Sequence, residues 1–215
     1  MTHGDSTDEL EARQAALQDE ATAILSELEE STLFAGFGAL VLTGSYVSGL
    51  MTWPEIDVML RVGPDFASAD VFGLLMRVVQ LPGVVEIHYT DERGPRAPTD
   101  AKRDERYHAT IGMERVETGE PVGPRANQSG IWQIDLSLWL HDDHANLTAW
   151  HEDLRNSITD EQRRAVLQIK DTWHRKASYP DEVGGLDIYT AVLEADVRTP
   201  DGFSAWLAER GLPHT

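Results

Sequence analysis

Residues 40–60 read LVLTGSYVSGLMTWPEIDVML and hold the side chains best suited to chemistry in this sequence. Glu55 and Asp57 alternate with the apolar Ile56 and Val58. Because side chains on a strand alternate between its two faces, both acids point to the same face. Two neighbouring carboxylates repel each other, and a cation between them removes that cost. The pattern therefore predicts a metal site on a strand.

A Gly-Ser turn precedes the two acids. Gly44 and Ser45 follow an apolar strand expected over residues 39–43. Such a turn supplies backbone N–H groups and a hydroxyl, which suit a phosphate, and a short helix is expected to start there. The turn and the acids together indicate metal-assisted chemistry on a nucleoside triphosphate. The plainer alternative, a turn followed by a solvated acidic edge, accounts less well for the spacing.

The stretch resembles the signature of the nucleotidyltransferase superfamily, the polymerase-beta-like fold. That signature is an apolar residue, Gly-Ser, a spacer of about ten residues and then acid-apolar-acid-apolar. Gly44, Ser45, Glu55 and Asp57 occupy its polar positions. The first acid is usually Asp, and the longer Glu55 can alter the metal geometry. A catalytically weak or inactive protein that binds a nucleotide or a partner is therefore the alternative function.

The resemblance implies a third carboxylate on a neighbouring strand. Asp135, in the segment WQIDLSLW, is the leading candidate, because a charge among apolar neighbours is costly unless it is paired or bound to metal. Glu86, in VVEIHY, is the alternative third carboxylate. His88 shares its face and is interpreted as structural.

The resemblance also implies a mechanism. An acceptor hydroxyl attacks the α-phosphorus of a nucleoside triphosphate, with ATP the expected donor, and pyrophosphate leaves. Two Mg²⁺ ions held by Glu55, Asp57 and Asp135 would assist. Asp135 would also accept the hydroxyl proton. Gly44 and Ser45 would hold the β- and γ-phosphates.

Two residues from the C-terminal part are candidates for nucleotide binding. Lys170 belongs to a basic cluster with His174, Arg175 and Lys176, which either meets the triphosphate or stabilises a helix C-terminus. Tyr179 either stacks on the base or sugar or anchors local packing. The run from His141 to His144, HDDH, invites a metal interpretation, but adjacent residues in a turn rarely converge on one ion. We interpret it as a connection.

Composition limits the function classes. The 215 residues carry 18 basic and 37 acidic side chains, a net charge of −19. Such a surface repels nucleic acid and favours a small, cationic acceptor such as an aminoglycoside, as in antibiotic-modifying members of the resembled family. The absence of cysteine excludes disulfides and thiolate chemistry. With no apolar run long enough for a membrane helix and no signal peptide, a cytoplasmic location without membrane contact is expected.

The periodicity predicts an α+β protein, with a nucleotidyltransferase-like mixed sheet and helices followed by a C-terminal helical domain. We place the boundary between residues 143 and 144, so that 1–143 form the catalytic domain and 144–215 the helical one. Leu186 and Tyr189 are predicted core residues. Strands are expected over 39–43, 55–62, 84–90, 107–117 and 131–140, and helices over 7–30, 68–80, 144–156, 159–175, 184–196 and 200–210.

Overall fold

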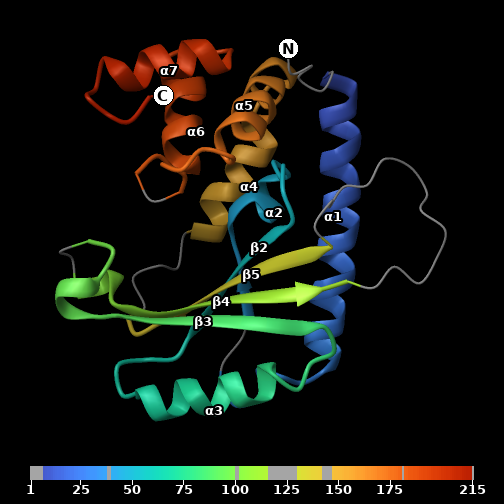
Figure 1. The fold of residues 1–215 in the computed structure, drawn as a ribbon, viewed down its shortest axis with the longest axis vertical. Helices are drawn as coiled ribbons and strands as arrows, with labels where there is room; N and C mark the ends of the chain where they lie inside the picture. The colour runs from blue at the N-terminus through green and yellow to red at the C-terminus, as the bar shows by residue number, and fades with distance from the viewer. Residues whose placement is uncertain are drawn as a thin grey trace.

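A computed structural model describes residues 7–37, 40–99, 102–115, 130–141, 147–180 and 182–214. The predicted domain boundary falls outside these ranges, as does the HDDH run beyond His141. The predicted α+β class is confirmed: a five-stranded mixed sheet is followed by four helices (Figure 1).

The sheet has the strand order β1-β2-β5-β4-β3. Strands β2 and β5 pair in parallel, and every other neighbouring pair is antiparallel. The order brings together β2 and β5, which are far apart along the chain and carry the predicted acids. The bounds are β1 Leu40–Leu42, β2 Glu55–Arg61, β3 Val84–Glu92, β4 Arg106–Glu114 and β5 Ile131–Trp139.

One face of the sheet is apolar and covered by two helices. Helix α1 (Thr7–Glu30) and helix α3 (Ser68–Val78) pack against the inward side chains of the strands. Burial of this face provides the main driving force for folding. The opposite face carries Asp57, Thr110 and Asp135, so the alternation of the strands separates the core from the polar side chains.

The C-terminal helices build a second apolar core. It contains Trp173 and Phe203, and Leu50, from the segment after helix α2 (Gly44–Ser48), joins it. A capping box at Thr159 starts α5: Gln162 N donates to Thr159 Oγ1 at 3.2 Å. The helices are α4 Leu147–Ser157, α5 Asp160–Trp173, α6 Gly185–Glu194 and α7 Pro200–Ala208.

Helix α1 links the two cores. Its C-terminal half covers the sheet, while near its N-terminus Arg13 pairs with Asp171 of α5. Arg163 of α5 donates to Gln14 Oε1 at 2.6 Å and to the carbonyl of Gly49 at 2.6 Å. These bonds hold α1, α5 and the end of α2 in one arrangement.

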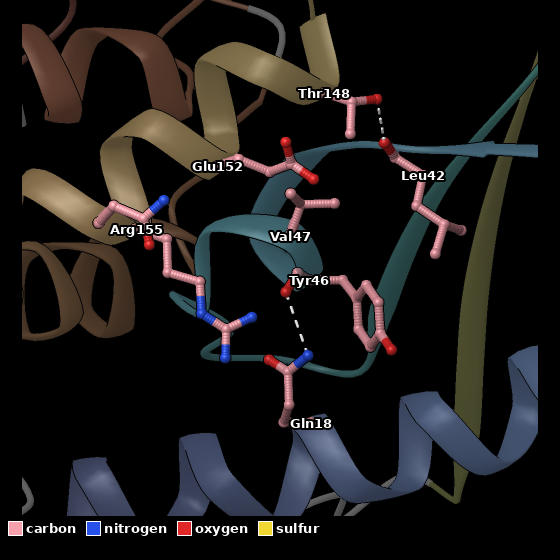
Figure 2. A pocket seen from close by; sticks show the side chains of 8 residues that line it. Gln18, Leu42, Tyr46, Val47, Thr148, Glu152 and Arg155 are labelled. Carbon is pink, nitrogen blue, oxygen red and sulfur yellow. Dashed lines mark hydrogen bonds between the residues drawn. The ribbon is translucent and has the colours of Figure 1, made fainter.

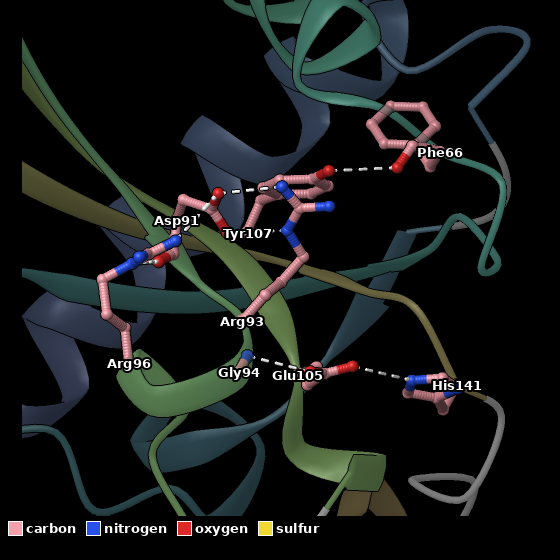
Figure 3. Close-up of polar contacts among 8 residues, drawn as sticks. All are labelled: Phe66, Asp91, Arg93, Gly94, Arg96, Glu105, Tyr107 and His141. Atoms are coloured by element: carbon pink, nitrogen blue, oxygen red, sulfur yellow. Dashed lines mark hydrogen bonds and ion pairs between the residues drawn. The ribbon is translucent and has the colours of Figure 1, made fainter.

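A polar cluster fixes the far end of the β3–β4 hairpin (Figure 3). Arg93 donates twice to the Asp91 carboxylate, at 2.7 and 2.8 Å, and stacks over the ring of Tyr107. Tyr107 Oη donates to the carbonyl of Phe66 at 3.1 Å, and Glu105 accepts from the N–H of Gly94 at 2.8 Å. These contacts explain why β3 continues to Glu92, two residues beyond its predicted end.

The other boundaries differ by a few residues. Helix α3 ends at Val78 rather than at residue 80, and α4 is described from Leu147. Within the described ranges, no helix is long and apolar enough to cross a membrane.

Truncating a buried strand residue tests the sheet core. Leu60 of β2 is fully buried, whereas Leu186 of α6 is 68% exposed. We predict that Leu60→Ala lowers the free energy of unfolding by about 2–5 kcal/mol, because it removes packed methyl groups and leaves a cavity. The matched change Leu186→Ala should cost less than about 1 kcal/mol. Urea unfolding of both variants measures the difference, and equal costs would contradict the assigned core.

Candidate active site

The predicted acids lie on two adjacent strands. In the parallel pairing of β2 with β5, Asp57 is the register partner of Asp135, and Glu55 is the partner of Gln133. All four side chains lie on the polar face of the sheet. The structure therefore brings Glu55, Asp57 and Asp135 to one place, as the sequence predicted.

Gly44 lies against the carboxylate of Asp57. It has a φ of +68°, and a Cβ atom there would sit 1.8 Å from Asp57 Oδ2. Only glycine suits both the left-handed backbone and this close approach. The N–H of Ser45 donates to the Asp57 carboxylate, and so this amide is already engaged. The Gly-Ser turn thus positions an acid as well as offering a phosphate site.

Lys170 extends from α5 to the same turn. Its side chain is only 1% exposed, and its Nζ donates to Ser45 Oγ at 2.5 Å and to the carbonyl of Leu50 at 2.9 Å. The ammonium also lies 4.8 Å from the centre of the Trp53 ring. Lys170 therefore lies at the Gly44-Ser45 turn, and helix C-terminus stabilisation does not account for this geometry.

Trp53 and Gln133 hold the Glu55 carboxylate. Trp53 Nε1 donates to Glu55 Oε2 at 2.7 Å, and Gln133 Nε2 donates to Glu55 Oε1 at 3.4 Å. Trp53 is fixed in turn by stacking on His174, with ring centroids 4.9 Å apart, and by an edge contact with Tyr179. These contacts orient Glu55 toward the other acids.

Burial and mutual repulsion raise the pKa values of Glu55 and Asp57. Burial raises the pKa of Glu55 well above its ordinary value, and the charges of Asp57 and Asp135 add to the effect. Burial, then the charge of Asp135, raises the pKa of Asp57 to about 6, although Lys170 and the N–H of Ser45 oppose the shift. Such coupled, perturbed acids are typical of functional sites.

Asp135 has its own supporting side chains on β4. Thr110 Oγ1 donates to Asp135 Oδ1 at 3.1 Å, and His108 Nε2 lies 3.9 Å from the same oxygen. His108 Nδ1 is 3.7 Å from Glu92 Oε1, and Arg106 donates to that carboxylate at 2.5 Å. A polar strip therefore runs from Asp135 across β4 to β3.

A pocket of about 510 Å³ opens over the acids. Its remaining walls are mainly aromatic and apolar. His151 Nδ1 is buried, and the described residues provide it with no hydrogen-bond partner. Burial, then the charge of Lys170, lowers the His151 pKa to about 4, so this ring is neutral at pH 7. The lining comprises Gly44, Ser45, Glu55, Asp57, Asp135, Trp150, His151, Lys170, Tyr179, Pro180, Gly185, Leu186 and Tyr189.

Three sequence interpretations need correction. Glu86, the alternative third carboxylate, lies on β3, separated from β2 by β4 and β5, and is exposed. The basic cluster does not converge on the site, because Arg175 pairs with Asp171 and Lys176 lies over Trp173. Leu186 is not core but is exposed beside the pocket, because a helical period does not show whether a face packs or lines a cavity.

The acids fit a hard divalent cation by donor type and position. Among the described residues, no three His, Cys, Asp or Glu side chains converge closely enough to hold a metal ion by themselves. Mg²⁺ is usually bound through one or two carboxylates completed by substrate phosphates and water. Asp57 and Asp135 in register, with the Gly44-Ser45 turn beside them, match that arrangement.

A second cavity, of about 520 Å³, lies among α1, α2 and α4 (Figure 2). It is bounded by hydrogen bonds from Gln18 Nε2 to the carbonyl of Tyr46 and from Thr148 Oγ1 to the carbonyl of Leu42. Glu152 is its single carboxylate. It lacks the paired acids and the buried cation of the first pocket, which we therefore take as the candidate active site.

Several residues of the site could not be predicted from the sequence. Trp53 lies two positions before Glu55, but nothing in the sequence predicts that its indole bonds that acid. Trp150 and His151 are adjacent on α4, and only tertiary packing turns them toward β2. Gln133 is the exception, since strand alternation places it on the face of Asp135.

No protein-family model and no curated protein matches the chain. Solved structures do match. The Cid1 poly(U) polymerase with MgGTP bound has a TM-score of 0.55 and 14% identity, over 83% of this chain and 50% of that one. A cytoplasmic RNA terminal U-transferase has a TM-score of 0.51 and 13% identity, over 82% and 45%. The GLD-2/RNP-8 complex has a TM-score of 0.51 and 12% identity, over 95% and 72%.

These likenesses establish the fold. The chain spans about half the length of the first two structures. At such identities shared architecture does not determine the reaction or the acceptor. The chain has the nucleotidyltransferase-like fold that the Gly44–Asp57 stretch predicted, and the small-molecule subtype remains a prediction.

The raised pKa of Asp57 predicts how stability depends on pH. Between its ordinary value of 3.8 and about 6, folded Asp57 keeps a proton that the unfolded chain has lost. Its contribution to stability therefore falls as pH rises through this window and stays lower above it. Asp57→Asn should remove that decline and make the metal-free protein more stable than wild type near pH 7.

Urea unfolding across the window, with a chelator present, measures this effect. Asp153→Asn, on an exposed part of α4, is the matched control for the lost charge. Parallel stability profiles for wild type and Asp57→Asn would contradict the proposed repulsion.

Proposed function

We propose that the protein is a nucleotidyltransferase. It transfers a nucleoside monophosphate from a nucleoside triphosphate, with ATP as the expected donor, to a hydroxyl of a small cationic acceptor. The observation that carries this proposal is the pairing of Asp57 with Asp135 in register, beside a glycine turn backed by the buried Lys170. An acceptor oxygen, a phosphate and a cation would meet there.

Each residue has a defined part in the proposed reaction. Glu55, Asp57 and Asp135 would hold Mg²⁺, which supplies positive charge to the triphosphate and the leaving pyrophosphate. The Gly44 N–H and the Ser45 hydroxyl would bind the β- and γ-phosphates, with the charge of Lys170 behind them. Asp135, at the start of the polar strip, would accept the proton of the attacking hydroxyl.

The far wall of the pocket suits a nucleoside. Tyr179 lies in edge contact with Trp53, and Trp150 and Leu186 are exposed beside the cavity. Flat aromatic surfaces stack on any base. The buried, neutral His151 ring would exchange a hydrogen bond with the base edge, which would satisfy its free nitrogen.

Charge supports a cationic acceptor. The net charge is −19, from 18 basic and 37 acidic side chains. Such a surface attracts polyamines and repels phosphates. The solved structures similar to this chain are named for RNA substrates, and an RNA acceptor is therefore the outcome to be tested against the small molecule.

One assay decides between these functions. The protein is incubated with Mg²⁺, each nucleoside triphosphate in turn, and either aminoglycosides, lincosamides or a short RNA, and released pyrophosphate is measured. Pyrophosphate release that requires a cationic small molecule supports the proposal. Release with RNA alone would overturn the acceptor. Binding of nucleotide without release under any condition would favour the catalytically inactive alternative.

Asp57 is the residue whose loss should stop the reaction. We predict that Asp57→Ala lowers transfer at least about a hundredfold, because it removes a ligand worth several kcal/mol of charge stabilisation. The rise in melting temperature caused by Mg²⁺ and nucleotide should also disappear. Thermal melts with and without both ligands provide this second readout. Equal Mg²⁺ stabilisation of the variant and wild type would contradict the metal site.

Ser45 tests the phosphate turn. We predict that Ser45→Ala weakens binding of a non-hydrolysable triphosphate by about 1.5–3 kcal/mol, since it removes a hydrogen bond to a charged phosphate. The variant also takes one acceptor from the buried Lys170. Calorimetric titration measures the change. Ser26→Ala, which removes a hydroxyl from α1, is the control, and an unchanged dissociation constant for Ser45→Ala would show that the turn binds no phosphate.

A further inference from the structure

Strand β3 is an unusually open sheet edge. It ends the strand order, spans nine residues, and pairs on one side with β4, while no described strand covers its other side. Exposed edges are normally shortened or interrupted by proline or lysine, because free N–H and C=O groups recruit another strand. Strand β3 contains neither residue, and its one bulge, between Val84 and Glu86, lies at its start and leaves Glu86–Glu92 in regular pairing with β4.

An apolar patch lies beside this edge. Phe72, Met76 and Val79 of α3 and the adjoining turn, together with Val85 of β3, are 47–65% exposed. The first three recur with helical spacing, so they lie on one side of the helix. The Phe72 ring lies 5.2 Å from that of Tyr89, which makes the patch continuous from α3 to β3. A contiguous exposed patch of this kind marks an interaction surface.

The apolar patch itself carries no acidic side chain. Helix α3 contains one acid, Asp70, and its carboxylate accepts from the N–H of Ala67 at 2.8 Å. Elsewhere the chain is strongly acidic, with a net charge of −19. Strand β3 contains Glu86, Asp91 and Glu92, so two copies that meet along it repel each other least in a register that keeps these acids apart.

We propose that β3 is a homodimer interface, in which β3 of a second copy pairs antiparallel with it about a twofold axis at Ile87. Such an axis, perpendicular to the sheet, keeps the same face of both copies on one side. The two sheets would join into one, and α3 would meet its copy on the apolar side. The acids on β2 and β5 would remain open on the other side.

Pairing an acid with a histidine, and apolar residues with each other, selects this register. With the axis at Ile87, Glu86 lies opposite His88 of the partner subunit, and His88 opposite the partner's Glu86. On the other face Ile87 meets its own copy, and Val85 lies opposite the partner's Tyr89. Opposite charges and apolar pairs across strands stabilise a sheet. An axis at Glu86 would place two like charges together, and one at His88 would place Val85 opposite an acid.

Within one chain, Glu86 and His88 are already compatible. Their side chains are exposed, and His88 Nε2 lies 3.8 Å from Glu86 Oε2. In the dimer each would gain a second, directly opposite partner. The interface would therefore hold two symmetric Glu–His pairs flanking an apolar centre.

Sedimentation equilibrium of the full chain tests the proposal. The expected species has twice the 23.9 kDa mass of one chain. His88→Glu should raise the dimer dissociation constant about tenfold or more, because it places acids opposite each other twice. The exchange variant Glu86→His/His88→Glu restores both pairs and should recover the wild-type constant. Ala208→Glu, on the exposed side of α7, is the control for the added charge.

Engineered cysteines test the register. The chain has no cysteine of its own. A mixture of the Glu86→Cys and His88→Cys proteins should form an intermolecular disulfide, because directly opposite residues have Cα atoms about 4.5–5.5 Å apart. Either protein alone should not, since its two cysteines would be about 8 Å apart on the diagonal.

Three results would overturn the proposal. One is a monomer at the highest soluble concentration. Another is a dimer that keeps its dissociation constant in both His88→Glu and Met76→Lys. The third is a cross-link that forms as readily in the single-variant samples as in the mixture. Far-ultraviolet circular dichroism of each variant confirms that its fold is retained.

Discussion

The repulsion among Glu55, Asp57 and Asp135 is the constraint on which the site depends. Three carboxylates in one place would destabilise the sheet if nothing opposed their charges. The structure opposes them with Lys170, the N–H of Ser45 and hydrogen bonds from Trp53, Gln133 and Thr110. These groups do not cancel the combined effect of burial and repulsion, as the raised pKa values of Glu55 and Asp57 show. The remaining cost is what a bound cation would relieve.

The fold meets this constraint by joining two cores. The sheet supplies the acids, and α5 supplies the lysine from the other core. Their relative position is fixed by α1, which covers the sheet and pairs with α5 through Arg13, and by the bonds of Arg163. A buried ammonium that bridges cores is well placed because its donors find acceptors in the turn it supports.

Local sequence patterns predicted those features of the site that are formed by residues close together in the sequence. The Gly44–Asp57 spacing and the alternation around Asp135 are short-range features, and the structure contains both of them. The parallel pairing of β2 with β5 is different, because it depends on contacts across most of the sheet. Leu186 was wrongly predicted to be core, since a helix that lines a cavity has the same period as one that packs. No local sequence pattern indicates that Trp53 and His151 belong to the site.

The burial of Lys170 also means that the acids depend on a residue outside their own sequence signature. A segment with the strands and the turn alone would contain three repelling acids without the buried ammonium of Lys170 beside them. The short signature that makes the sequence recognisable is therefore incomplete as a physical unit. A substitution in α5 that shortens the Lys170 side chain would change the pKa values of Glu55 and Asp57, although these acids lie far from α5 in the sequence. Comparisons limited to residues 40–60 would miss that dependence.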